Sequence, residues 1–299
     1  MRCDVLVVGA LHLDVIVNAP ALPRLDETLR GTSVAYAFGG KGGNQAVALA
    51  RMGAGVAMAG RIGQDGFADR ITEVLDRAGV DHRQVLRQPG ASGMSVAIVD
   101  DAGDYGAVIV SAANLDIAPD DIVIPEGTRL ICLQNEISES VNIALARAAH
   151  VLGIAVMLNA APARAVTAGT EALYQTLIVN RIEALDMTGK DEAHQAALAL
   201  RACGYERVLV TLGGEGVVVA EGESVTHYPG HSVQVVSTHG AGDAFVGAFA
   251  ARLCQGDMTE DAVHFAQAAA ALHVSCPVAQ RDRITVDAVR AFQRGTVKR

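Results

Sequence analysis

The sequence contains no tryptophan, only 4% aromatic residues, and five widely separated cysteines without a C-x-x-C pair. An odd number of isolated cysteines argues against a disulfide framework and against a structural zinc site, and it predicts reduced thiols. The scarcity of aromatic rings leaves no evident platform on which a nucleobase could stack. These absences argue against a fold stabilised by disulfides or zinc, and against a surface that binds nucleobases by stacking.

Positive charge is also scarce, because 24 Lys and Arg residues face 33 Asp and Glu, which gives a formal net charge of −9. No basic block offsets this balance, so we expect no nucleic-acid partner. The apolar run at residues 5–8 is too short to span a membrane, and Asp14 interrupts the stretch before a signal-peptide pattern develops. We expect a cytoplasmic protein without a membrane partner. The negative net charge does not exclude a phosphate-binding site, since such a site needs only a few local donors.

Apolar residues and glycines are abundant. Of 299 residues, 51% are hydrophobic, and 31 glycines stand against 8 prolines. This composition favours a compact fold with many tight turns over a disordered chain. No linker or repeat interrupts the sequence, so we expect one domain over residues 1–299.

Apolar segments alternate between short β-branched runs and longer stretches of helical periodicity. Strands are expected at residues 5–8, 56–59, 130–133, 154–158, 176–179 and 207–211, and helices at 44–52, 65–78 and 138–152. Such alternation is typical of a mostly parallel sheet with helices on both faces. The fold class is therefore expected to be a three-layer α/β/α arrangement.

Two segments, at residues 11–38 and 92–112, break this alternation with strand-like patterns. The second contains an expected hairpin at 95–99 and 105–110 around a turn-like stretch. We expect these segments to form a small β-sheet that acts as a lid over one edge of the core. The C-terminal third begins with a hairpin at 216–220 and 224–228 and continues with helices at 241–256, 259–273 and 285–294.

The run Gly-Ala-Gly-Asp at residues 240–243 passes from a strand into a helix. The backbone N–H groups of these four residues are expected to be unpaired at the helix start, where they and the helix dipole form a pocket for an anion. Asp243 in this first turn is either an ordinary N-terminal charge or a general base beside a phosphate. Its position alone favours neither reading.

Two further runs follow strands. Residues 211–216, Thr-Leu-Gly-Gly-Glu-Gly, offer backbone donors to a phosphate, although a glycine turn between two strands is the more common explanation. Asn180 and Glu183 begin a helix, where they could reach a nucleotide or a metal-bound water. An Asn cap with Glu at its third position is the better local explanation.

The glycine cluster at residues 39–43, followed by Asn44, could close around a hydroxylated ligand with Lys41 and Asn44 as polar contacts. It is not a Walker A loop, because G-x-x-x-x-G-K-[ST] is absent. Glu136 follows an expected strand and could accept a hydroxyl group. A solvated loop carboxylate is the default reading of Glu136.

Six segments, in this order, resemble the ribokinase, or PfkB-type, family of carbohydrate and nucleoside kinases, in its ribokinase branch. They are Val8 to Asp14, residues 39–46, residues 159–164, Asn180 with Glu183, residues 211–216 and residues 240–245. The resemblance runs nearly from end to end. It implies an ATP-dependent sugar kinase with Mg²⁺, whose lid often pairs with the lid of a second subunit to make a homodimer.

The resemblance assigns roles to individual residues. Asp243 would be the general base, and Gly240, Ala241 and Gly242 would form the anion hole. Contacts to the sugar would come from His12, Asp14, Gly40, Lys41, Gly42, Gly43, Asn44, Glu136 and Asp243. Contacts to ATP would come from Asn180, Thr211, Leu212, Gly213, Gly214, Glu215, Gly216, Gly242 and Gln267. Glu183 would act on Mg²⁺ through water.

The sequence departs from the family pattern where the resemblance implies a monovalent-cation site. Ser237 stands where the family usually has the aspartate that helps to hold the cation, and His239 follows two residues later. Val278 and Asp282 occupy late-loop positions where Gly and Ser are usual. We therefore expect potassium activation to be weakened or lost.

A second departure is His12, where a ribokinase has Asn beside the substrate. His12 is either a loop histidine without a ligand or a bulkier substrate contact with one donor and one acceptor. Lys41, Asn44 and Glu136 keep the ribose-type pattern, so a pentose such as D-ribose is the first expectation. A nucleoside kinase is the alternative, and an inactive sugar-binding protein of the same fold is the third reading.

Overall fold

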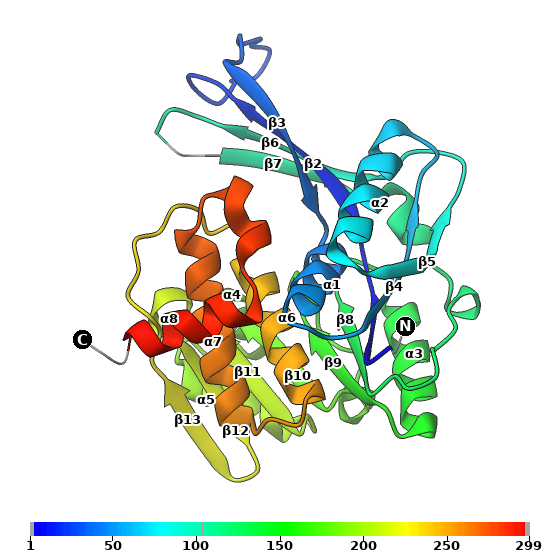
Figure 1. The fold of residues 1–299 in the computed structure, drawn as a ribbon, viewed down its shortest axis with the longest axis vertical. Helices are drawn as coiled ribbons and strands as arrows, with labels where there is room; N and C mark the ends of the chain where they lie inside the picture. Colours follow the sequence, from blue (N-terminus) through cyan, green and yellow to red (C-terminus); the bar gives the residue numbers. More distant parts are fainter. Residues whose placement is uncertain (1–2, 103–104, 297–299) are drawn as a thin grey trace.

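The computed structural model describes residues 3–102 and 105–296 of the chain. Within them a nine-stranded sheet has the order β13-β12-β11-β10-β9-β8-β1-β4-β5 (Figure 1). Its strands are β1 Val5–Val8, β4 Val56–Ile62, β5 Asp81–Arg87, β8 Leu130–Gln134, β9 Ala155–Asn159, β10 Thr176–Asn180, β11 Arg207–Thr211, β12 Val217–Glu221 and β13 Ser224–Tyr228. The strands from β5 to β11 pair in parallel, and β12 and β13 add an antiparallel hairpin at the edge.

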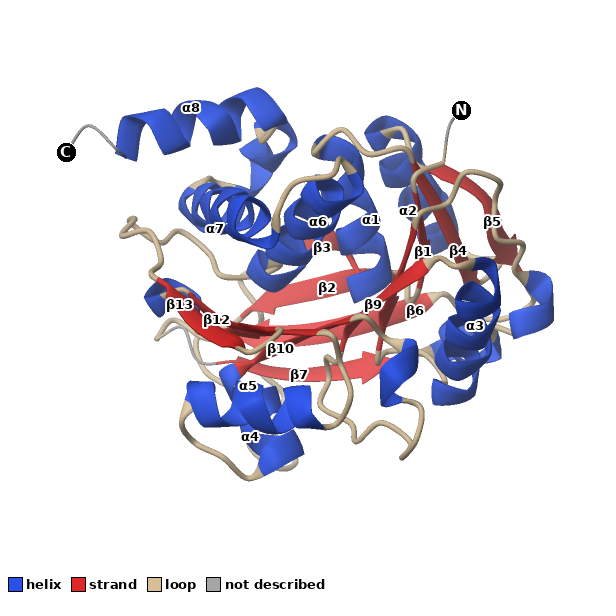
Figure 2. Cartoon of the chain, turned by 90° about the horizontal axis from the view of Figure 1, so that it is seen from below, coloured by secondary structure: helices blue, strands red, loops and turns tan. Residues whose placement is uncertain are grey.

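Helices cover both faces of this sheet (Figure 2). One face carries α1 Lys41–Arg51, α2 Gly66–Ala78, α6 Ala241–Cys254, α7 Thr259–Ser275 and α8 Val286–Thr296, and the other carries α3 Glu139–Leu152, α4 Arg181–Thr188 and α5 Ala193–Ala202. The central strands β1, β8, β9 and β10 are buried on both faces, which explains their continuous apolar runs, whereas the edge strands β5 and β13 are partly exposed. Two separate hydrophobic clusters result, one under each helical layer.

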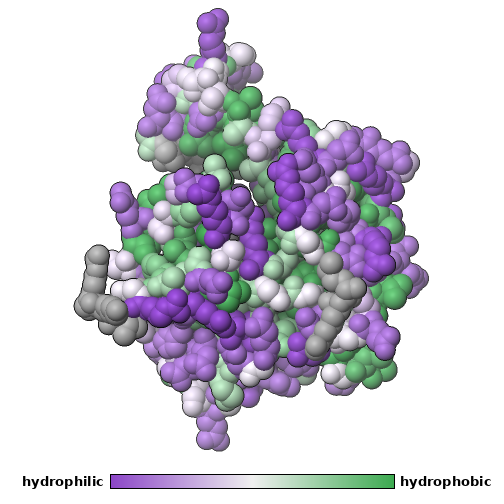
Figure 3. All heavy atoms as spheres, in the orientation of Figure 1, coloured by the Kyte–Doolittle hydropathy of each residue, from purple (hydrophilic) through white to green (hydrophobic). Residues whose placement is uncertain are grey.

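A second sheet of four strands, in the order β3-β2-β6-β7, projects from the core (Figure 1). It consists of β2 His12–Asn18, β3 Ser33–Gly39, β6 Gly93–Val99 and β7 Tyr105–Val110. The two segments that break the α/β alternation therefore meet in one sheet. The space-filling view shows the projecting sheet standing apart from the body of the molecule, with apolar side chains on the part turned toward it (Figure 3).

The expected α/β/α fold class is confirmed, with differences at particular elements. The helix expected at 44–52 starts earlier, because α1 begins at Lys41 and includes Gly42 and Gly43 of the glycine cluster. The reason is packing: a side chain at Gly42 would lie 2.8 Å from the Cα of Gly9 at the end of β1, so only glycine lets the helix approach the strand. The hairpin expected at 216–228 joins the main sheet, and neither β5 nor α5 was expected from the sequence.

No helix in the described part of the chain combines the length and apolar character needed to cross a bilayer. The longest, α7, has 17 residues and carries Glu260 and Asp261 in its first turn.

Candidate active site

Asp243 is the third residue of α6, which begins after Gly240 in the left-handed conformation (φ 74°). Its side chain is only 7% exposed. The two carboxylate oxygens accept hydrogen bonds from α1, one from Asn44 Nδ2 at 3.1 Å and one from Gln45 Nε2 at 3.0 Å. The carboxylate does not cap its own helix, because no side chain makes a capping hydrogen bond at this N-terminus. Its place in the first turn of α6 fits an ordinary N-terminal charge, and its contacts with α1 also make it part of a buried polar group.

A row of buried amides stands behind this carboxylate. Gln45 Nε2 also donates to Asn159 Oδ1 at 3.0 Å, and Gln45 Oε1 accepts from Gln134 Nε2 at 2.9 Å. Asn142 Nδ2 in turn donates to the Gln134 carbonyl at 2.9 Å. These amides orient Gln45, and Gln45 orients Asp243. Sequence reasoning missed the roles of these residues, although Gln134 and Asn159 each end an apolar strand, where a polar side chain is a signal.

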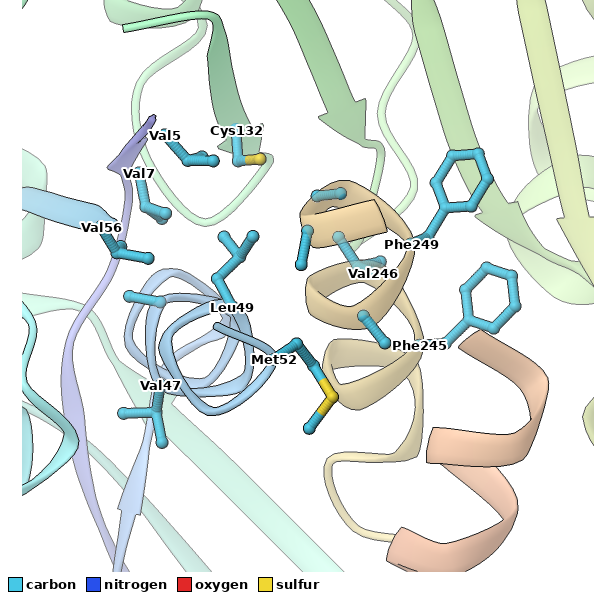
Figure 4. Packing of buried hydrophobic residues seen from close by; sticks show 14 of the residues in the cluster. Val5, Val7, Val47, Leu49, Met52, Val56, Cys132, Phe245, Val246 and Phe249 are labelled. Atoms are coloured by element: carbon cyan, nitrogen blue, oxygen red, sulfur yellow. The ribbon is translucent and has the colours of Figure 1, made fainter. Parts of the chain in front are cut away.

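Packing between α1 and α6 holds the donors against Asp243. Leu49 of α1 and Met52 at its end lie on the side of α1 that is turned toward α6, while Phe245 and Phe249 point to the other side of α6 (Figure 4). These two rings stack with centroids 6.2 Å apart. The buried faces of both helices fix their distance, so Asn44 and Gln45 reach the carboxylate without rearrangement.

The start of α6 leaves backbone donors free. No residue that the structure describes accepts a hydrogen bond from the N–H groups of Gly242 and Asp243. The expectation that all four N–H groups of residues 240–243 are unpaired is wrong at Ala241, whose N–H donates to the Thr238 carbonyl at 3.1 Å. This bond closes the turn at Gly240. The free donors and the helix dipole make this point attractive to an anion.

Glu136 lies at the N-terminus of α1, where its Oε2 accepts the Lys41 N–H at 2.7 Å. Burial raises the pKa of Glu136 from 4.5 to about 7, against the lowering effects of the Lys41 hydrogen bond and charge. Asp243 and Asp14 raise it further. Glu136 lies in the turn after β8, as the loop reading expected, but it is half-buried rather than fully solvated, and it belongs to the same group of charges as Asp243.

Asp14 is a buried carboxylate of the projecting sheet, 6% exposed. Its Oδ1 accepts from Ser95 Oγ at 2.6 Å, across the pairing of β2 with β6. Its Oδ2 lies 3.8 Å from Nε2 of His239, in the segment that leads into α6. The Asp14–His239 contact thus connects the second sheet to the approach to Asp243.

His12 is the first residue of β2 and is buried, with 3% exposure. His12 therefore lies in a strand, and the interpretation of His12 as a loop histidine is wrong. Burial lowers its pKa, and the nearby Asp14 opposes this shift. Its Nε2 is buried and has no hydrogen-bond partner among the described residues. A buried nitrogen without a partner is costly, which marks this position as one that a polar ligand could satisfy.

Asn180 and Glu183 form a complete capping box at the start of α4. Asn180 Oδ1 accepts the Glu183 N–H at 2.8 Å, and Glu183 Oε2 accepts the Asn180 N–H at 2.7 Å. The capping interpretation is therefore confirmed. Burial raises the pKa of Glu183, while Lys41 lowers it and Asp243 raises it. Glu183 thus interacts with the same charges as Glu136.

The run at residues 211–216 joins β11 to β12 through a short 3₁₀ helix, Gly213–Glu215. Leu212 N–H donates to the Gly216 carbonyl at 2.8 Å, and Arg181 binds Glu215 at 2.7 Å, which links this turn to α4. Gln267 on α7 is buried, and its Nε2 donates to the Tyr228 carbonyl at 2.8 Å. This bond holds the end of the edge hairpin. Sequence reasoning missed Arg181.

The positions that depart from the family's cation pattern lie around an arginine. The carbonyls of Ser237 and His239 both accept hydrogen bonds from Arg281, each at 2.9 Å. Val278 and Asp282 are exposed in the 3₁₀ helix Val278–Arg283 that carries this arginine. A cavity of about 260 Å³ opens beside them. Its lining includes Tyr36, Phe38, Asn44, Arg51, His239, Gly240, Asp243 and Arg281.

The structure thus brings Asp14, Lys41, Asn44, Glu136 and Asp243 together beside the start of α6. Asn180, Glu183 and residues 211–216 lie at the carboxyl ends of β10 and β11, the edge of a parallel sheet where ligands bind. The shared influence of Lys41 and Asp243 on Glu136 and Glu183 shows that the two groups adjoin. Asp243 lies where they meet.

Comparison with known proteins agrees with this arrangement. The sequence pattern of the pfkB family of carbohydrate kinases matches residues 3–285. A ribokinase of Haemophilus influenzae is 32% identical over 294 residues, covering 94% of this chain and 95% of that protein. A deoxyribokinase of Salmonella typhi is 31% identical over 283 residues, covering 91% and 92%.

Among solved structures, that of Arabidopsis thaliana ribokinase complexed with ribose and ATP superimposes with a TM-score of 0.91 at 30% identity, and the match covers 98% of this chain and 99% of that one. The similarity therefore extends over both sheets and all helical layers. The chain belongs to the pfkB family of carbohydrate kinases and is a ribokinase-type, ATP-dependent sugar kinase.

Proposed function

We propose that this kinase transfers the γ-phosphate of ATP to a hydroxyl of a pentose such as D-ribose, with Asp243 as the general base. One observation carries the proposal. The Asp243 carboxylate is held by Asn44 and Gln45 beside the free N–H groups that begin α6. A base and an anion pocket at one point are what phosphoryl transfer to an alcohol requires.

In the proposed reaction a sugar hydroxyl gives its proton to Asp243 as its oxygen attacks the γ-phosphorus. The bond between this phosphorus and the β,γ-bridging oxygen breaks, and ADP leaves. Negative charge on the transferring group would be met by the N–H groups of Gly242 and Asp243. The hydrogen bonds from Asn44 and Gln45 keep the carboxylate oriented in the absence of substrate.

Sugar hydroxyls would contact Asp14, Lys41, Asn44 and Glu136, and the backbone of Gly40, Gly42 and Gly43. The carboxylates offer acceptors and Lys41 offers donors, which suits a polyol. The named ribokinase and deoxyribokinase relatives, and the Arabidopsis complex with ribose and ATP, support a pentose. His12 would add a contact through its unpartnered Nε2.

ATP would lie along Asn180, residues 211–216, Gly242 and Gln267. No group of three His, Cys, Asp or Glu side chains within the described residues is arranged to hold a metal on its own. This fits Mg²⁺ bound mainly by nucleotide phosphates, with Glu183 acting through water. When bound, Mg²⁺ would supply positive charge that offsets the charge of the phosphates.

The second sheet would act as a lid over the sugar, and it offers a surface for a homodimer. Strand alternation and the pairing register place Val34, Tyr36, Val96, Val108 and Val110 on one face, and all five are exposed. An identical apolar face on a second copy can cover it about a two-fold axis. We propose pairing of the two lids.

A nucleoside is the second candidate acceptor. Tyr36 and Phe38 line the same cavity as Asp243, and their rings could contact a base. The Ser95 hydrogen bond and the buried position of Asp14 favour a sugar, because they present a polar wall on the same sheet. The intact base and free N–H groups argue against an inactive sugar-binding protein.

The test is ADP release by the purified chain with MgATP and a panel of pentoses, hexoses, polyols and nucleosides. We expect the fastest turnover with a pentose. Asp243→Asn should lower kcat about 10³-fold, since general base catalysis contributes on that order, and should leave sugar affinity in calorimetry largely unchanged. Asp261→Asn, an exposed carboxylate in the first turn of α7, is the control. Turnover retained by Asp243→Asn contradicts its role, and activity confined to nucleosides contradicts the pentose.

A further inference from the structure

Arg281 is a buried arginine in the 3₁₀ helix after α7, with 7% of its surface exposed. Its two terminal nitrogens bind backbone carbonyls rather than acids: Nη1 donates to the His239 oxygen and Nη2 to the Ser237 oxygen, each at 2.9 Å. These carbonyls are two residues apart and both point at one guanidinium. The next residue, Gly240, is the turn into α6.

No carboxylate among the described residues forms an ion pair with Arg281, and its Nε has no hydrogen-bond partner. Burial lowers the pKa of Arg281, but an arginine remains protonated in proteins. A buried charge without a counter-ion is unfavourable unless dipoles or a ligand compensate it. Here the two carbonyl dipoles compensate it in part, and the positive field remains available to a nearby anion.

The same segment is fastened to α7. The N–H groups of Val236 and Ser237 both donate to the Val274 carbonyl, and His273 Nε2 lies 2.8 Å from the His239 carbonyl. Burial lowers the pKa of His273 to about 4, so its ring is neutral and Nε2 is the donor. Arg281 is therefore the charged member of a group of donors that fix the approach to the Gly240 turn.

We propose that Arg281 is a built-in cation that positions the anion pocket of α6 and takes the place of a diffusible monovalent cation. A metal cation beside this turn would need the oxygen lone pairs that the guanidinium already occupies, and the fixed charge would repel it. Ser237 offers only a neutral hydroxyl at the position where a carboxylate could attract a metal ion. The inference rests on the proposed function, because it concerns the pocket that meets the phosphoryl charge.

Arg281 acts on the pocket through the carbonyls of Ser237 and His239, so it is a positioning residue. His239 also lies 3.8 Å from Asp14 in the lid. Loss of the guanidinium should therefore loosen the segment between the lid and Asp243. We expect kcat to fall more than the KM for the sugar rises, since the pocket serves the transition state.

The first measurement is turnover of the unmodified chain with its best sugar in sodium, potassium and tetramethylammonium chloride at equal ionic strength. Rates should agree within about twofold, because the three salts screen charges to the same extent at equal ionic strength. The melting temperature is measured in the same salts, which reports cation binding without turnover. It should show no rise specific to potassium.

The second measurement uses variants. Arg281→Ala should lose about tenfold or more in kcat, as removal of one electrostatic stabiliser does, and guanidinium at concentrations far below denaturing ones should restore part of it. Arg281→Lys should retain more activity than Arg281→Ala. Arg283→Ala, an exposed arginine two residues further on, is the matched control and should change nothing.

The double variant Ser237→Asp with Arg281→Ala removes the fixed charge and adds a carboxylate beside the two carbonyls. It should gain potassium-specific stimulation, and a potassium-specific rise in melting temperature even if Arg281→Ala alone folds poorly. A large potassium effect on the unmodified chain, or an unchanged kcat in folded Arg281→Ala, overturns the inference. Absence of sugar turnover in every salt contradicts the proposed function. The inference about Arg281 is then still tested by the melting temperatures, which should rise specifically in potassium for the double variant and not for the unmodified chain.

Discussion

Asp243 is oriented by residues far from it in sequence. Asn44 and Gln45 bind its two oxygens, and Gln45 is held by Asn159 and Gln134 from the ends of two strands. Gln45 uses both the donor and the acceptor of its amide on these partners, so its orientation is defined, whereas Gln134 Oε1 has no hydrogen-bond partner among the described residues. Buried polar groups that satisfy one another rigidify a site, whereas a single unmatched group would destabilise it.

Glu136 provides a prediction at this scale. Its pKa rises from 4.5 to about 7 through burial, so the folded chain binds a proton more tightly than the unfolded chain does. The stability contributed by this proton is present below pH 4.5 and is lost as the pH rises through about 7. Glu136→Gln removes the ionisation. The variant should therefore gain about 1–3 kcal/mol in unfolding free energy relative to the unmodified chain between pH 5 and pH 8.

Thermal or urea unfolding at several pH values measures this difference. Glu223→Gln, in the exposed turn between β12 and β13, is the control and should show no such trend. A constant difference between Glu136→Gln and the unmodified chain across this pH range contradicts the expected ionisation.

At the scale of elements, the turn into α6 is the part of the structure on which the site depends most. Gly240 has a left-handed backbone, and a side chain there would lie 3.2 Å from His273 Nε2. Gly256, after the other end of α6, also has a positive φ but has open space around it. The two glycines therefore share a backbone preference and differ in their neighbours.

Gly240→Ala and Gly256→Ala should each destabilise the chain by about 1–2 kcal/mol, the cost of a left-handed residue with a Cβ. Only Gly240→Ala should also lower kcat, by about tenfold, because it would displace the free N–H groups that are proposed to bind the transferring phosphoryl group. Urea unfolding and steady-state turnover of both variants make the comparison. Equal kcat values would show that the geometry of the turn is unimportant for turnover.

At the scale of the molecule, two sheets share the site. The large sheet supplies the strand ends and the helix starts, and the small sheet supplies Asp14 and His12. The small sheet has an apolar face that the rest of the described chain leaves exposed around Val34 and Val108. Such a face on a small projecting sheet is explained if a second copy covers it.

Val108→Asp should therefore dissociate the proposed dimer, because a charge in an apolar interface is not compensated. Ile109→Asp is the control, since Ile109 is similarly exposed and points to the opposite face of β7. Sedimentation equilibrium over a range of protein concentrations gives the mass of each variant. A monomeric unmodified chain, or equal dissociation by both changes, contradicts pairing through this face.

The sequence alone determined the alternating elements, the fold class and the run at residues 240–243, because periodicity, strand ends and glycines are local signals. It also indicated that Ser237 and His239 depart from the family pattern. Local signals placed the start of α1 three residues late, because the packing of Gly42 against Gly9 is a contact between distant segments.

Only the tertiary structure shows which side chains surround Asp243. Gln45 and Asp243 are 198 residues apart, and Arg281 follows His239 by 42, so no spacing rule connects them. Their contacts exist because helix packing brings α1, α6 and the segment after α7 together. Burial then raised the pKa of Glu136, and the fold placed Arg281 where no carboxylate among the described residues forms an ion pair with it. Solvent exclusion is a property of the whole fold, and the order of residues does not reveal it.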